Sequence, residues 1–202
     1  SRTIVFACRP ANQAAALPCA EQIITRLATR AYRRPLTGHD KAGLIGFYKQ
    51  GEVAGGFEEG VRVAIQAMLA SPHFVFRFEE APRNIAAGTD YKISDTDLAT
   101  RLSFFLWGTI PDEQLLGLGM QNRLSQPGVL EAQVKRMLAD KRAEALSSRF
   151  AAQWLRLQDI EKVRPDAFWF PDYDQQLADA MYKETELFFQ DVVRNNRNVL
   201  DL

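Results

Sequence analysis

Apolar residues recur at three- and four-residue spacing through most of the chain, the pattern of amphipathic helices. The clearest stretch begins at Ser94, which with Asp97 forms a capping-box-like start. The apolar positions that follow fall on one helical face: Leu98, Leu102, Phe105 and Leu106. Gly108 then ends the helix, and Pro111 can occupy the first turn of the next. We expect the aromatic residues at this corner, Phe104, Phe105 and Trp107, to lie in the core.

Similar stripes predict further helices over most of the chain, in residues 18–34, 37–50, 57–70, 125–139, 141–157 and 174–193. Thr37 with Asp40 predicts a second capping box at the start of 37–50. In the last of these, Leu177, Met181, Phe188, Val192 and Val193 are expected to face inward. Between the helices, GEVAGG (51–56) predicts a loop after a helix that closes at Gly51, and 163–174 predicts an aromatic loop. In 71–82, Phe74, Phe76 and Phe78 alternate as in a strand, but the segment fits a short helix or an extended turn equally well.

Only Thr3–Ala7 has the composition of a strand, and no partner strand is evident. We therefore predict an all-α fold, an orthogonally packed bundle of about seven or eight helices with one short N-terminal strand or arm. Residues 1–202 are expected to form a single helical module with candidate halves 1–82 and 91–202. We also expect this module to be a fragment of a larger multidomain protein.

The composition excludes several classes of protein. Of 202 residues, 47% are apolar and 25% charged, which is typical of a globular domain. Twenty-five basic and twenty-five acidic residues give a formal net charge of zero, so no nucleic-acid partner is expected. No apolar run approaches the roughly 20 residues of a spanning helix, so no membrane span is expected.

The two cysteines, Cys8 and Cys19, are separated by too many residues for a haem-attachment or redox motif. They are either a disulfide or two free thiols. A bridge would contribute about 3 kcal/mol by closing a short loop. It would also indicate an oxidising compartment.

Few residues have the setting of a catalytic or ligand-binding group. His73, among aromatic residues, is either a half-buried structural histidine or an axial haem or metal ligand, but no second ligand stands at a suitable spacing and no metal site is expected. Arg33 and Arg34 either complement a helix end or form a docking patch for a carboxylate or for another domain. Glu184, beside an apolar face, and Asp112 are the candidate acids.

Several strings in fixed order, among them FACRP, RAYRRPLT, LASPHF, RLSFFLWGTIPD and FAAQWLRLQDI, carry a resemblance that spans nearly the whole chain. They resemble large secreted proteins of planctomycetes, myxobacteria and related bacteria, built from domains of unknown function associated with planctomycete cytochrome c domains. The resemblance implies a periplasmic or secreted location, a carbohydrate-binding-like domain upstream and CxxCH haem-attachment segments downstream. Cys8 and Cys19 fall on the family's paired positions, which implies a disulfide.

The resemblance also implies a function for the chain. We expect a non-catalytic helical module that scaffolds, or supports electron transfer, next to a haem segment and a polysaccharide-binding domain of the same polypeptide. We expect no cofactor in the fragment itself, and the resemblance implies haem c as a candidate cofactor of the full-length protein. His73, Arg77, Arg33 and Arg34 are candidate contacts to a haem edge or to its propionates. There are two alternative functions. The chain is either part of a polysaccharide-active hydrolase or oxidoreductase that uses Glu184 and Asp112, or a purely structural interaction domain. Whether the chain is an enzyme therefore stays open.

Overall fold

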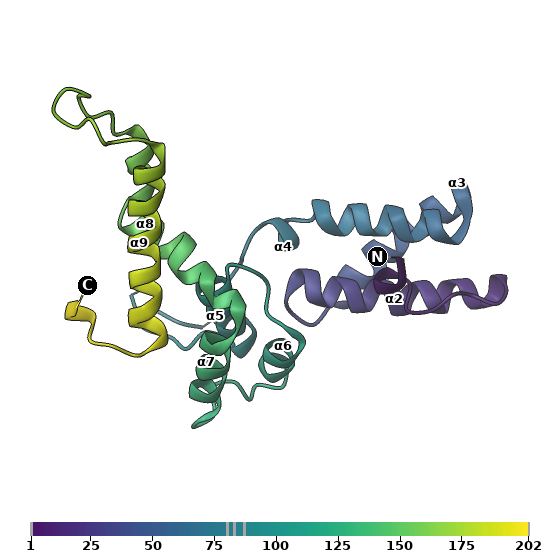
Figure 1. Cartoon of the computed structure of the whole chain (residues 1–202). Helices are drawn as coiled ribbons and strands as arrows, with labels where there is room; N and C mark the ends of the chain where they lie inside the picture. The colour runs from purple at the N-terminus through teal and green to yellow at the C-terminus, as the bar shows by residue number, and fades with distance from the viewer. Residues whose placement is uncertain (1, 80, 83, 87, 202) are drawn as a thin grey trace. The chain divides into compact units, whose positions relative to one another are not determined.

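A computed structural model describes residues 2–79, 81–82, 84–86 and 88–201, and within these ranges every regular element is helical (Figure 1). The predicted all-α class is confirmed. The α-helices are α1 (Arg2–Val5), α2 (Ala16–Tyr32), α3 (Gly38–Ala70), α4 (Pro72–Val75), α5 (Asp95–Trp107), α6 (Glu113–Met120), α7 (Val129–Ala139), α8 (Ala152–Trp154) and α9 (Gln175–Arg194). Short 3-10 or π-helical segments are η1 (Gln13–Ala15), η2 (Lys141–Ala143), η3 (Leu146–Ala151), η4 (Leu157–Lys162) and η5 (Val199–Asp201).

The chain divides into two compact units, which we describe separately. The first unit contains the residues up to Thr100 together with Ile110–Leu124. The second contains Arg101–Thr109 and the residues from Ser125 onward. Helix α5 contributes residues to both units.

The predicted strand at the N-terminus is wrong, and the alternative of an arm describes it better. Arg2–Val5 is a single helical turn, closed by a hydrogen bond from Phe6 N to Arg2 O of 2.9 Å. Whether a short segment forms a strand depends on its pairing and packing, and no strand lies within the described residues to pair with this one. Arg26 of α2 instead donates to the carbonyl oxygens of Ile4 (2.6 Å) and Val5 (3.0 Å). A disulfide between Cys8 and Cys19 fastens the arm to the same helix.

The core of the first unit forms between α2 and α3. One face of α2 and the facing side of α3 are buried against each other: Ala20, Ile23, Ile24, Ala28, Tyr32, Leu44, Tyr48, Val61, Ala64 and Met68. Helix α3 begins with the predicted capping box, in which Thr37 Oγ1 accepts from Asp40 N and the Asp40 side chain accepts from Thr37 N. Burial of these large side chains supplies most of the unit's stabilisation.

Helix α3 does not end at Gly51, and residues 51–54 are helical rather than part of a loop. The break falls at Gly55 and Gly56, where Gly56 adopts φ +80°, a conformation that glycine reaches at little cost. The two halves of α3 then meet closely, because a Cβ at Gly51 would lie 2.9 Å from the Cα of Gly60. Gly51 therefore serves as a contact between helices and not as a helix end.

The corner after α5 is partly as predicted. The Ser94–Asp97 capping interaction is present, with Asp97 N donating to Ser94 Oγ at 3.1 Å. Pro111 lies before helix α6 rather than in its first turn, since Asp112 is the N-cap and its side chain accepts from Leu115 N at 2.9 Å.

Of the aromatic residues at the end of α5, only Trp107 is fully buried. In the second unit its indole N–H donates to Met137 O at 2.9 Å, and the Arg142 guanidinium lies 3.5 Å from the ring centroid. Phe105 is exposed and its ring lies beside that of Phe150, whereas Phe104 is half-buried. Residues two apart point to nearly opposite sides of a helix, so Phe105 and Trp107 cannot both face one core.

The second unit departs from the predicted long helix over 141–157. This stretch is η2, then the π-helical η3, then the single turn α8. Helix α9 starts where the sequence predicts, directly after its N-cap Asp174, whose side chain accepts from Leu177 N at 2.7 Å. The inward face predicted for α9 is wrong in part: Leu177, Met181 and Phe188 are exposed, whereas Ala178, Phe189 and Val192 are buried. Two apolar stripes adjoin on this helix, and the pattern alone does not say which one packs.

Candidate functional site

Arg33 is the residue that organises the most distinctive surface of the first unit. It follows the last residue of α2 in the left-handed conformation (φ +58°), and it is only 6% exposed. Its Nη1 donates to Ala31 O (2.8 Å), and its Nη2 donates to His73 O and Phe76 O (both 2.8 Å). The guanidinium thus links the end of α2 to the segment that contains α4. Burial, and next the charge of Arg77, lower the pKa of Arg33 from its ordinary value.

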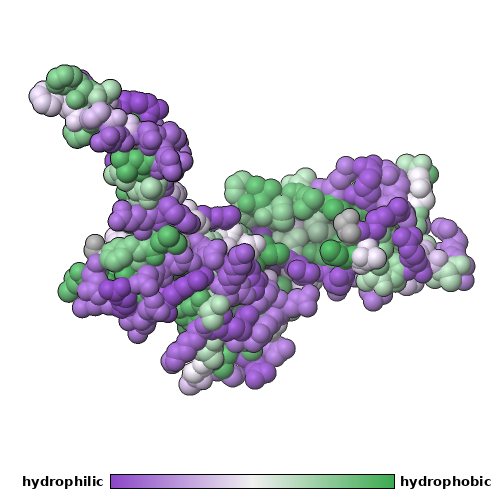
Figure 2. Space-filling model, viewed as in Figure 1, coloured by the Kyte–Doolittle hydropathy of each residue, from purple (hydrophilic) through white to green (hydrophobic). Residues whose placement is uncertain are grey.

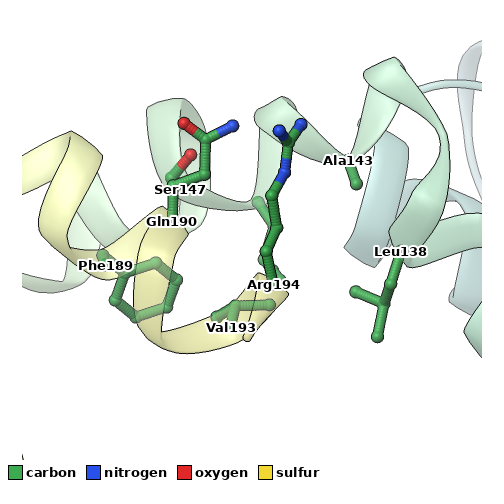
Figure 3. A pocket seen from close by; sticks show the side chains of 8 residues that line it. Leu138, Ala143, Ser147, Phe189, Gln190, Val193 and Arg194 are labelled. Atoms are coloured by element: carbon green, nitrogen blue, oxygen red, sulfur yellow. The ribbon is translucent and has the colours of Figure 1, made fainter. Parts of the chain in front are cut away.

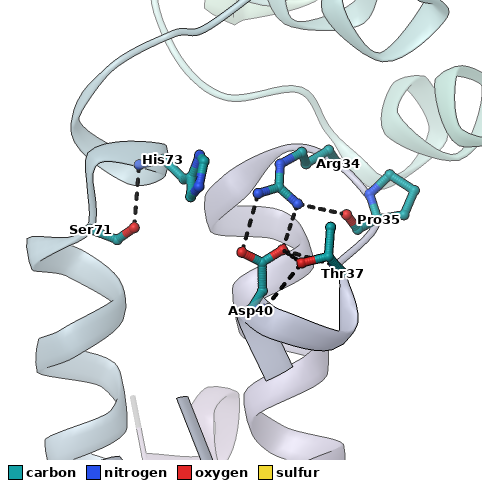
Figure 4. Close-up of polar contacts among 6 residues, drawn as sticks. All are labelled: Arg34, Pro35, Thr37, Asp40, Ser71 and His73. Carbon is teal, nitrogen blue, oxygen red and sulfur yellow. Dashed lines mark hydrogen bonds and ion pairs between the residues drawn. The ribbon is translucent and has the colours of Figure 1, made fainter. Parts of the chain in front are cut away.

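Helix α4 is a single turn defined by local contacts. Ser71 caps it through a hydrogen bond from His73 N to Ser71 Oγ (3.3 Å), and Pro72 occupies the first turn, where it needs no N–H donor (Figure 4). At the other end, Phe76 N donates to Pro72 O (2.8 Å). Arg33 satisfies the carbonyl groups of His73 and Phe76, two of those that a single turn leaves open.

The segment 72–78 and the end of α3 present large apolar side chains to solvent. We call this set the aromatic surface: Leu69, Phe74, Val75, Phe76 and Phe78, all of which are exposed. Figure 2 shows an apolar area over the C-terminal part of α3 and over α4. The Phe76 and Phe78 rings lie 5.9 Å apart. Isolated exposed apolar residues are ordinary, but a contiguous group marks an interaction site.

His73 lies beside the aromatic surface and is half-buried. Its ring centroid is 5.5 Å from that of Tyr32 and 5.9 Å from that of Phe78. The histidine therefore has the aromatic packing of the structural alternative, with one edge near the surface. Arg77 stands between the two exposed phenylalanines in sequence and is itself exposed.

Arg34 belongs to the same corner but is engaged elsewhere. It forms an ion pair with Asp40 (2.7 Å) and donates to Pro35 O (3.0 Å), as Figure 4 shows. Burial by itself raises the pKa of Asp40, but the Arg34 guanidinium and the hydrogen bonds from Thr37 hold that pKa well below its ordinary value. This pair fixes the connection between α2 and α3.

The two candidate acids have different surroundings. The Asp112 carboxylate, in the first unit, is used as the N-cap of α6. Glu184, in the second unit, is an exposed residue of α9. No cluster of three or more metal-ligating side chains occurs among residues 2–79, 81–82, 84–86 and 88–201. No helix in those same ranges is both long and apolar enough to cross a bilayer.

One cavity of the second unit lies between α7, η3 and the end of α9 (Figure 3). Its volume is about 10 Å³, which is about the space of one water molecule. Its lining is formed by Leu138, Ala143, Leu146, Ser147, Phe189, Gln190, Val193 and Arg194. A space of this size is a packing defect and not a ligand site.

Sequence reasoning named His73, Arg33, Arg34 and Arg77, and the structure brings His73 and Arg33 together. The sequence did not identify Arg33 as the group that holds the 73–76 turn. The bonded carbonyls lie 40 and 43 residues further along the chain, and no local pattern signals them. The alternating phenylalanines of 74–78 were a signal for the aromatic surface, since three large apolar residues in so short a segment cannot all be buried by one turn.

Residues 93–202 match the family model PSD4, described as a protein of unknown function (DUF1592), and residues 19–79 match PSD5, described as a protein of unknown function (DUF1595). Both are cytochrome c-associated domains that occur in larger multidomain proteins. No curated protein and no solved structure matches the chain.

Proposed function

The chain belongs to the PSD4 family of proteins of unknown function (DUF1592), and from that premise we propose that it is a non-catalytic helical module of an exported multidomain protein. It scaffolds, or supports electron transfer, next to a haem c segment and a polysaccharide-binding domain of the same polypeptide. The single observation that carries this proposal is the aromatic surface, which Arg33 holds in place.

The chemistry of the aromatic surface suits the edge of a haem. A haem edge combines an apolar macrocycle with propionate carboxylates. Phe76 and Phe78 supply exposed rings, and Arg77 beside them supplies a guanidinium, the group best suited to carboxylate recognition. In this proposal Arg77 and His73 make the contact, and Arg33 positions the turn through the bonds it already forms. Arg34 fixes the neighbouring connection between α2 and α3 through its ion pair with Asp40.

Two further observations support the proposed context. The Cys8–Cys19 disulfide is typical of proteins in oxidising compartments, which agrees with export to the periplasm or beyond. The family matches are to cytochrome c-associated domains.

The visible spectrum of the longer native protein tests the proposal. We expect a Soret band, and we expect Arg77→Gln and Phe76→Ser to shift the reduction potential of the haem. Arg62→Gln is the matched control, because Arg62 is an exposed arginine of the same unit that pairs with Glu59. Absence of a Soret band in the longer protein would exclude the redox role. Unchanged reduction potentials in both variants would exclude a contact between the haem and the aromatic surface.

A further inference from the structure

Residues 163–174, the aromatic loop, connect η4 to α9 in the second unit, and local hydrogen bonds close the turn that carries the aromatic side chains. Asp166 organises the turn: its Oδ1 accepts from Phe168 N (2.8 Å), and its carbonyl oxygen accepts from Trp169 N (3.1 Å) and Phe170 N (2.9 Å). Pro165 and Pro171 restrict the backbone on either side of the rings. The loop is therefore already shaped before any ligand arrives, which reduces the entropy lost on binding.

The three consecutive aromatic side chains of the loop point into solvent. Phe168 is 81% exposed, Trp169 73% and Phe170 60%. The first two rings lie 5.2 Å apart and perpendicular to each other, so each leaves a face open. Figure 1 shows the loop extending beyond the N-terminal end of α9, and Figure 2 shows apolar atoms at its tip. A loop that is held by its own hydrogen bonds and exposes three aromatic rings in series marks a binding surface.

A groove opens at the base of the same loop, with a volume of about 330 Å³, within the usual range of small-ligand sites. We call it the polar groove, and it is lined by Ile160, Glu161, Gln175, Ala178, Asp179, Tyr182, Lys183 and Glu186. Glu161 and Gln175 lie just outside the two ends of the loop, so the groove lies at the base of the loop that carries the rings. The lining offers amide, phenol and carboxylate groups, all of which hydrogen-bond to hydroxyl groups.

The charges of the polar groove and the aromatic loop indicate which class of ligand can bind there. Lys183, the one cation of the polar groove lining, pairs with Glu186 (2.9 Å), which leaves the lining acidic through Glu161 and Asp179. The loop adds Asp166, Asp172 and Asp174 against the single cation Arg164. This acidic setting repels nucleic acids, anionic lipid surfaces and acidic glycans.

We propose that the aromatic loop and the polar groove together bind a neutral polysaccharide. Sugar rings present apolar C–H faces that stack on aromatic side chains, and their hydroxyl groups bond to amides, phenols and carboxylates. Trp169 and Phe168 carry the stacking, while Tyr182, Gln175 and Asp179 receive hydroxyl groups of the adjoining sugar units. This inference is independent of the haem contact, because it concerns the second unit alone.

Affinity electrophoresis of the full chain in gels that contain hydroxyethylcellulose, xylan, glucomannan or mixed-linkage β-glucan tests the proposal. We expect retardation by at least one of these polymers and a loss of affinity of about tenfold for Trp169→Ala. Tyr182→Phe should weaken binding to a lesser degree. Trp154→Ala is the matched control, because Trp154 is an exposed tryptophan of the same unit (58%) outside both features, and it should leave retardation unchanged.

Circular dichroism establishes that each variant remains folded. Failure of every polymer to retard the chain would overturn the proposal, as would an equal loss of affinity in Trp154→Ala. Trp169-dependent binding to phosphatidylcholine vesicles or to polylysine, without binding to any of the four polymers, would likewise overturn it and assign the loop to a membrane surface or a basic partner.

Discussion

Replacing Arg33 by methionine should free the segment 71–76 without unfolding the first unit. Methionine keeps an apolar stem but removes the guanidinium, which leaves three carbonyl oxygens without their donors at 2.8 Å. If each of these bonds contributes about 1 kcal/mol net, the total is about 3 kcal/mol. Two of the three bonds hold the 73–76 turn, so most of this loss should appear there as local opening.

Hydrogen exchange followed by mass spectrometry is the assay, because local opening is read directly from amide protection. The amides of Phe74 and Phe76, bonded to Ser71 O (2.9 Å) and Pro72 O (2.8 Å), report on the turn. The two bonds to the turn account for about 2 kcal/mol, which corresponds to roughly 30-fold faster exchange at these positions. Arg62→Met, an exposed arginine on α3, should leave the same amides unchanged.

Two further substitutions separate the side chain of Arg33 from its backbone. Arg33→Lys keeps the charge but lacks the planar fork, so exchange should be intermediate. Arg33→Gly relieves the left-handed backbone at a gain of up to about 1 kcal/mol but should expose the turn as much as methionine does. Unchanged protection of residues 71–76 in a folded Arg33→Met protein would refute the assignment of Arg33 as the group that holds the turn.

Three further predictions concern the stability of the first unit. Cys8→Ser opens the disulfide loop and should lower the free energy of unfolding by about 3 kcal/mol; a urea melt with an unchanged midpoint would contradict this. Gly60→Ala places a methyl group 2.7 Å from the Tyr48 ring and should lower the free energy of unfolding by about 1–3 kcal/mol. Gly43→Ala is the control, because Gly43 is a helical position with open space, and it should leave the stability unchanged or raise it. Equal melting temperatures of the two variants would contradict the packing argument. The pKa of Asp40 lies well below its ordinary value because its hydrogen bonds outweigh its burial, so its stabilisation is present above about pH 4 and is lost as the pH falls further toward the folded-state pKa. Asp40→Asn should flatten the acid limb of a melting-temperature profile, and parallel profiles for the two proteins would exclude this linkage.

Features set by a few consecutive residues could be predicted from the sequence. The capping interactions of Thr37 with Asp40 and of Ser94 with Asp97 were visible, since cap and backbone donor lie within three residues. The all-α class followed from the spacing of apolar residues. The predicted strand at Thr3–Ala7 failed for the complementary reason, because a strand depends on a partner that local composition cannot supply.

The sequence by itself thus determined the helical class, the caps and the presence of an aromatic loop at 163–174, because these depend on side chains and backbone groups close together in the chain. Only the tertiary structure decided that Cys8 and Cys19 are joined, which apolar stripe of α9 is buried, and that Arg33 holds a turn some 40 residues away. The physical reason is that burial and long-range hydrogen bonds arise only when distant segments meet. The surfaces available to partners are the parts that such packing leaves exposed.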